Sequence, residues 1–166
     1  VREVLEDILR DRVQFIVLGK GDGIFENYFL EMQKVYSEKM RALIAFNQDL
    51  SRKIYAGADI FLMPSKSEPC GLSQMIASRY GTVPIVRETG GLADSIRDVG
   101  CEGGGNGFTF ANYNASDLLN RVRCAMIAYE DRPSWTELVR KIMRIDFSWN
   151  RSAREYVELY RGIELG

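Results

Sequence analysis

One carboxylate and three glycines, in two short stretches of the chain, are the residues best suited to bind a polar ligand. Glu68 and Gly71 follow one apolar run, and Gly90 and Gly91 follow the next one along the chain. A carboxylate accepts hydrogen bonds, so Glu68 suits the hydroxyls of a sugar better than a phosphate. The glycines have no side chain to keep a ligand away from the backbone. Together these residues predict a site for a sugar or a diphosphate.

The elements that position these residues are two successive strand–loop–helix units. The apolar run Ile60–Met63 is followed by a loop at 64–70, here called the Glu68 loop, and then by a helical pattern over 71–80. The second run, Val83–Val86, leads through Thr89-Gly90-Gly91-Leu92 to another helix. In a parallel sheet, the carboxyl ends of neighbouring strands and the N-termini of the following helices meet at one crevice. Each helix N-terminus offers unpaired N–H groups and about half a positive charge. We therefore expect anionic and polar groups to bind there.

The rest of the chain continues the same alternation of strands and helices. Further strands are expected at 13–18, 40–45 and 108–110, and further helices at 1–10, 25–37, 48–56, 115–129, 133–145 and 149–161. This order is typical of an α/β domain in which helices cover both faces of a parallel sheet. A length of 166 residues suits one domain, over 1–166.

Composition excludes several functions. The chain has no histidine, which rules out Ser-His-Asp and Cys-His catalysis and histidine metal ligation within it. Its net charge of −1 gives no strong attraction to nucleic acid or to an anionic membrane. The three scattered cysteines, Cys70, Cys101 and Cys124, fit a reducing compartment rather than a disulfide framework.

A glycine-rich loop at 19–23 invites comparison with dinucleotide-binding proteins. The third glycine of the G-x-G-x-x-G fingerprint is replaced by Ile24, so an oxidoreductase is disfavoured. The loop can be a plain strand-to-helix turn or can face a ligand.

Aromatic residues of the last helix also allow two interpretations. Trp149, Tyr156 and Tyr160 could pack on their own domain, which we favour, or face another domain.

Motifs make the chain resemble the C-terminal domain of bacterial glycogen synthase and plant starch synthase, from about Val13 to Arg161. They include Glu-Pro-Cys-Gly-Leu-x-Gln from Glu68, Thr-Gly-Gly-Leu-Ala-Asp from Thr89, and Asp-Phe-Ser-Trp from Asp146. Those enzymes are retaining glucosyltransferases of the GT-B fold, in which two Rossmann-like domains face each other. The resemblance implies the C-terminal half of that fold: a Rossmann-like parallel sheet with helices on both faces, followed by C-terminal helices.

The resemblance also assigns roles to single positions. Glu68 matches the active-site glutamate that holds the donor glucose, and is the catalytic candidate. The other matching positions would bind substrate: Cys70 and Gly71 the donor sugar, Leu72 and Ser73 the diphosphate, and Phe46 the nucleobase by stacking. Thr89, Gly90 and Gly91 are further substrate-binding candidates, because they form the second loop of the predicted crevice.

Taken alone, these side chains have ordinary structural interpretations. A glutamate before a proline is usually a solvated turn residue, and only the motif around Glu68 favours function. Cys70 could be a small buried hydrophobe, Ser73 a hydroxyl that satisfies the helix backbone, and Phe46 a core residue at the end of a strand.

Some family features are missing from this sequence. Many GT-B transferases have a second glutamate eight residues after the first, where this chain has Ile76. Glycogen synthases commonly lack it too, so Ile76 favours that subgroup. Also missing are the family's first C-domain strand, with its diphosphate-binding Arg and Lys, and its N-terminal domain. We therefore expect a domain truncated at its N-terminal strand and inactive by itself.

The resemblance implies transfer of glucose from ADP-glucose to the non-reducing end of an α-1,4-glucan, with retention and without a metal ion. Its partners would be the donor, ADP, the glucan and the missing N-terminal domain, with neither nucleic acid nor membrane. The location would be cytoplasmic, or the plastid for a plant protein. The residues leave open whether the nucleotide is ADP or UDP. Alternatives are a non-catalytic module that binds nucleotide or glucan, and another GT-B glucosyltransferase similar to sucrose synthase.

Overall fold

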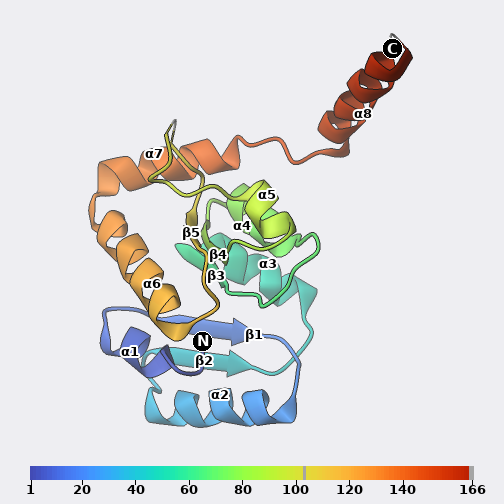
Figure 1. Ribbon diagram of the computed structural model, residues 1–166. Helices are drawn as coiled ribbons and strands as arrows, with labels where there is room; N and C mark the ends of the chain where they lie inside the picture. Colours follow the sequence, from blue (N-terminus) through green and yellow to red (C-terminus); the bar gives the residue numbers. More distant parts are fainter. Residues whose placement is uncertain (103, 165–166) are drawn as a thin grey trace.

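A computed structural model describes residues 1–102 and 104–164 of the chain (Figure 1). Strands and helices alternate along almost its whole length, as expected. The strands are β1 Phe15–Leu18, β2 Met40–Leu43, β3 Ile60–Met63, β4 Val83–Arg87 and β5 Phe108–Phe110. The helices are α1 Leu5–Arg10, α2 Gly23–Val35, α3 Gln48–Gly57, α4 Ser73–Tyr80, α5 Gly91–Ser95, α6 Ala115–Glu130, α7 Arg132–Met143 and α8 Trp149–Glu164.

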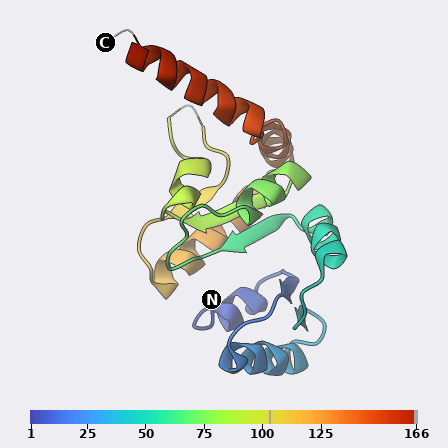
Figure 2. The ribbon, with the colours of Figure 1, turned by 90° about the vertical axis from the view of Figure 1, so that its right-hand side faces the viewer.

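All strand pairs are parallel, which confirms the predicted class, but the strands form two sheets where the sequence predicted one. β1 pairs with β2, and β3, β4 and β5 form a second sheet in that order. In Figures 1 and 2 the sheet of β1 and β2 lies beside β3, with β1 as its nearer strand. The division has a simple physical cause: no strand in the described part of the chain joins the edge of β1 to the edge of β3.

Strand β4 is the centre of the larger sheet, and it is buried on both faces. Val83 and Ile85 point to one face, where they join a core that includes Phe108 and Trp135. Val86 points to the other face and packs with residues of the α5 region. Helices therefore cover both faces of this sheet, as predicted.

Helix α1 joins the cores of the two sheets. Val4 and Ile8 pack in the core of the larger sheet, whereas Leu5 and Leu9 pack with Met40 of β2. Residues four apart lie on the same side of a helix, so Val4 with Ile8 and Leu5 with Leu9 form two adjacent apolar stripes. Each stripe packs in a different core.

The interpretation of the last helix as part of the domain's own core is wrong. Trp149, Tyr156 and Tyr160 are 86%, 58% and 61% exposed. Helix α8 extends away from the rest of the chain after an extended segment at 144–148, so its apolar side chains have no sheet to pack on (Figures 1 and 2). No helix in the two described ranges is long and apolar enough to cross a membrane.

The central position of β4 predicts a large cost for removing a side chain there. Ile85 is fully buried, so Ile85→Ala should lower the free energy of unfolding by about 2–5 kcal/mol. The matched control is Ile127→Ala on α6, whose side chain is 70% exposed, and it should change stability by less than about 1 kcal/mol. Urea unfolding of the chain measures both, and equal effects would contradict this description of the core.

Candidate functional site

The two loops of the predicted crevice lie next to each other at the carboxyl edge of the larger sheet. β3 and β4 are parallel neighbours, and the loops that follow them lead into α4 and α5. Neither helix has a side-chain cap at its N-terminus, where Leu72 and Gly90 occupy the cap positions. In contrast, Asn47 and Asn114 cap α3 and α6 through their side chains. The first N–H groups of α4 are therefore without side-chain caps, as an anion-binding site requires. Those of α5 are already occupied, because Gly91, Leu92 and Ala93 donate to backbone carbonyls of the two loops.

The two loops of the crevice are in backbone contact. The N–H of Gly91 lies 3.2 Å from the carbonyl oxygens of Glu68 and Pro69, to which it donates a shared hydrogen bond. A Cβ atom on Gly90 would lie 2.2 Å from the Glu68 carbonyl oxygen, and one on Gly91 would lie 2.0 Å from that of Cys70. Gly90 also has a positive φ of 46°. Only glycine fits at these two positions.

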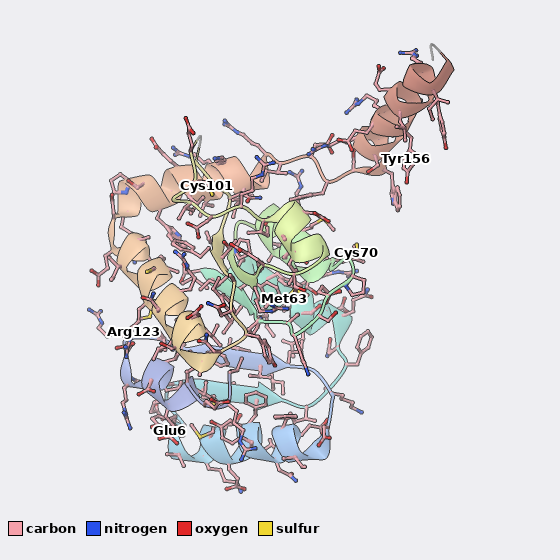
Figure 3. The ribbon with its side chains drawn as sticks, in the orientation of Figure 1. Glu6, Met63, Cys70, Cys101, Arg123 and Tyr156 are labelled. Carbon is pink, nitrogen blue, oxygen red and sulfur yellow. The ribbon has the colours of Figure 1, made fainter. Side chains whose placement is uncertain are left out.

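The structure brings most of the predicted residues together. One loop and the helix start after it contain Glu68, Cys70, Gly71, Leu72 and Ser73. The adjoining loop contains Thr89, Gly90 and Gly91. The side chain of Glu68 is half-buried, and Leu72 is 64% exposed at the start of α4. Ser73 is the first residue of that helix. Cys70 is exposed, at the outer edge of the loop (Figure 3), so its interpretation as a buried hydrophobe is wrong.

Phe46 is placed differently from the other candidates. It follows β2, in the smaller sheet, and its side chain is 91% exposed. The interpretation of Phe46 as a core residue is therefore wrong. The next residue, Asn47, accepts a 2.9 Å hydrogen bond from the N–H of Leu50 and fixes the start of α3. The ring is free to stack on a planar group that enters from solvent.

Arg87 is a site residue that sequence reasoning missed. Its guanidinium donates hydrogen bonds to the carbonyl oxygens of Ser65 at 2.9 Å and Lys66 at 2.6 Å. A third bond, of 3.3 Å, reaches the carbonyl of Ala111 after β5. Arg87 thus anchors the start of the Glu68 loop to the strand ends on either side. Its position as the last residue of a buried strand was the signal for this role.

The Asp-Phe-Ser-Trp motif lies across a groove from α4. Leu72, Ile76 and Arg79 line one side of this groove, and Phe147 and Ser148 line the other. The motif that begins at Glu68 and the motif that begins at Asp146 therefore share one surface. Ile76 is partly exposed in this groove.

Hydrogen bonds shape this second motif. The side chain and backbone of Ser148 donate to Asp146 and, with the nearby guanidinium of Arg154, hold the pKa of that carboxyl below its ordinary value.

Across residues 1–102 and 104–164, His, Cys, Asp and Glu side chains nowhere gather in groups of three that could hold a metal ion.

The backbone contact predicts that Gly91→Ala disturbs the site. The new methyl group must push the Cys70 carbonyl away, so the Glu68 loop should shift and nucleotide affinity should fall by about tenfold or more. Gly57→Ala is the control, because nothing lies within 4 Å of a Cβ at that position. Calorimetric titration of ADP into the full-length protein checks both variants, and unchanged affinity in Gly91→Ala would contradict the described contact.

Three comparisons with known proteins agree with this geometry. The sequence model for glycosyl transferases group 1 matches residues 1–142. The glycogen synthase of Bacillus cereus strain Q1 is 49% identical over 164 residues, which are 98% of this chain and 34% of that protein. The chain therefore spans about a third of the length of the curated relatives it matches.

Solved structures give the same result. The catalytic domain of starch synthase IV from Arabidopsis thaliana, bound to ADP and acarbose, is 38% identical and superposes with a TM-score of 0.87. That match covers 96% of this chain and 34% of the neighbour. Anabaena Alr3699/HepE in complex with UDP has a TM-score of 0.68 at 15% identity, over 96% of this chain and 44% of that one. This second likeness shows the fold alone.

Proposed function

Because the chain belongs to the glycosyl transferases group 1 family, we propose that it is the donor-binding domain of a glycogen or starch synthase. The observation that carries the proposal is the pair of loops, in which the Glu68 loop is in backbone contact with the start of α5 and leads into the N-terminus of α4, which has no side-chain cap. Relatives named glycogen synthase, at 49% identity over almost the whole chain, support the same function. The full-length enzyme transfers glucose from a nucleotide sugar to an α-1,4-glucan with retention.

The geometry divides the donor into parts that different groups bind. The diphosphate lies against the N–H groups of Leu72 and Ser73 at the start of α4, because helix N-termini stabilise negative charge. Glu68 accepts hydrogen bonds from the glucose hydroxyls and so orients the sugar above the diphosphate. Fixed N–H groups stabilise the leaving diphosphate, so we propose that transfer needs no metal ion. Retention of activity in excess EDTA tests that part of the proposal.

Phe46 supplies a stacking surface for the nucleobase. Stacking on an aromatic ring is worth about 1–3 kcal/mol and works with any base. ADP-glucose is the donor we favour, because the starch synthase neighbour at 38% identity is described as bound to ADP. The neighbour bound to UDP shares only the fold.

The open strand edges support a larger protein around this domain. Within the described ranges 1–102 and 104–164, β1 pairs with β2 alone, and β3 with β4 alone. Ile16 on β1 is 49% exposed, and the apolar strand β3 is only half-buried along its length. We propose that a further strand of the full-length enzyme pairs with both edges, and that its N-terminal domain holds the glucan across the crevice.

Cysteine chemistry supports a cytoplasmic location in a bacterium, or the plastid in a plant. Cys70, Cys101 and Cys124 are all free thiols. Two of them, Cys70 and Cys101, are exposed, which suits a reducing compartment.

The function is tested by initial-rate kinetics of the full-length enzyme with ADP-glucose and glycogen. Glu68→Gln keeps the shape of the side chain but weakens the orientation of glucose, so kcat should fall about 100-fold or more. Phe46→Ala should raise KM for ADP-glucose by roughly 5–150-fold, with little change in KM for glycogen. UDP-glucose, run in parallel, identifies the preferred donor.

Two matched controls guard against general damage. Glu31→Gln removes a carboxylate from a surface ion pair on α2, and Val35→Ala removes an apolar side chain that is 73% exposed at the far end of that helix. Both should leave the kinetics unchanged. Nucleotide binding by the full-length protein without any glucosyl transfer would instead indicate a non-catalytic binding module.

A further inference from the structure

Gln74, in the first turn of α4, is a fully buried polar side chain with no role in the donor site described so far. One N–H of its Nε2 is shared between the carbonyl oxygens of Gly71, at 2.9 Å, and Cys70, at 3.4 Å. The amide also packs against Gly71, since a Cβ there would lie 2.7 Å from Oε1. The side chain of Gln74 therefore fixes the turn that leads from the Glu68 loop into α4.

The same amide reaches the second loop of the crevice through Ser95. Nε2 of Gln74 donates to the Ser95 hydroxyl at 3.0 Å, and that hydroxyl donates to the carbonyl of Gly91 at 2.6 Å. A continuous chain of hydrogen bonds thus runs from the Cys70–Gly71 turn to the N-terminus of α5. It links the two helix starts, in addition to the direct backbone contact between the two loops.

The orientation of the amide has a cost. Oε1 of Gln74 is buried and is without a hydrogen-bond partner among the described residues. Turning the amide over would set Oε1 against two carbonyl oxygens, which is worse. A methionine of similar size would avoid an unpaired buried oxygen. The donors of Gln74, rather than its bulk, are therefore what this position uses.

We propose that Gln74 is a positioning residue for the donor site: it holds the Cys70–Gly71 turn against α5, so that Glu68 and the first N–H groups of α4 keep their spacing. Gln74 touches no substrate and acts through the turn. The proposal rests on the proposed function for its kinetic consequence, but not for its structural one.

The test compares Gln74→Met and Gln74→Glu in the full-length enzyme. Thr82→Val is the matched control. Thr82 follows the C-terminal end of α4, away from the turn, and its buried hydroxyl shares its one hydrogen between the carbonyls of Tyr55 and Ala58. This variant loses a similar bond without touching the turn. Ser95→Ala removes only the link to α5 and serves as a milder variant if both changes at Gln74 prevent folding.

The structural readout is the rate at which iodoacetamide labels Cys70, resolved by peptide mass spectrometry. Cys101 is exposed and lies outside the site, so its rate is the internal reference. The Cys70 thiol is exposed but donates a 3.8 Å hydrogen bond to the Gly71 carbonyl, so loosening the turn frees the thiol. Labelling of Cys70 should therefore accelerate about threefold or more in both Gln74 variants, to a smaller extent in Ser95→Ala, and not at all in Thr82→Val. Equal Cys70 rates in the wild type, the Gln74 variants and Ser95→Ala would overturn the proposal.

The kinetic readout separates positioning from loss of stability. In both Gln74 variants, kcat/KM for ADP-glucose should fall about tenfold, with KM for glycogen unchanged. A buried glutamate has a raised pKa and can donate a hydrogen bond when neutral. The activity of Gln74→Glu relative to wild type should therefore recover as the pH falls from about 8 to about 6, whereas Gln74→Met should show no recovery.

The outcomes distinguish the two proposals. A wild-type enzyme that transfers no glucose from any nucleotide sugar overturns the proposed function, and the Cys70 rates still decide the role of Gln74. An active wild type in which the Gln74 variants and Thr82→Val lose the same activity shows that Gln74 contributes only stability, and overturns the positioning role.

Discussion

The contact between the backbones of two loops, at Gly90–Gly91 and Glu68–Cys70, is the constraint on which the crevice depends. The Gly91 N–H lies between two carbonyls of the other loop, and neither glycine has room for a methyl group. Parallel pairing of β3 and β4 brings the two loops to the same edge of the sheet, where this contact forms. Arg87 fixes the loop where it leaves β3. The pairing of β3 with β4, the two glycines and the Arg87 guanidinium together fix the backbone of the loop that carries Glu68.

Much of this arrangement could be predicted from the sequence. Apolar runs located β3 and β5 at their observed bounds, and the turn residues located the starts of α4 and α5 within two residues. The site residues from Glu68 to Ser73 and from Thr89 to Gly91 came together because each group follows a strand of the same sheet. Local pattern carries such information well, since it depends on period and on backbone conformation.

The failures concern contacts that no local pattern encodes. The break between β1 and β3 depends on which strand is absent, and periodicity in the strands that are present cannot show it. The exposure of Tyr156 and Tyr160 depends on where the segment at 144–148 directs α8, although the helix itself was predicted. The bonds of Arg87 and Gln74 run to backbone carbonyls, so they depend on the tertiary positions of loops rather than on a recognisable partner residue.

The two open strand edges also affect how this chain behaves in concentrated solution. β1 reads Phe-Ile-Val-Leu and β3 reads Ile-Phe-Leu-Met, without a charge or a proline in either. Uncovered edges of that composition are templates for pairing with other chains, and natural proteins normally protect them with charges, bulges or a covering segment. The residues of β1 and β3 themselves carry no protective charge. A strand that paired with both edges would complete the sheet and would also prevent these edges from pairing with other chains.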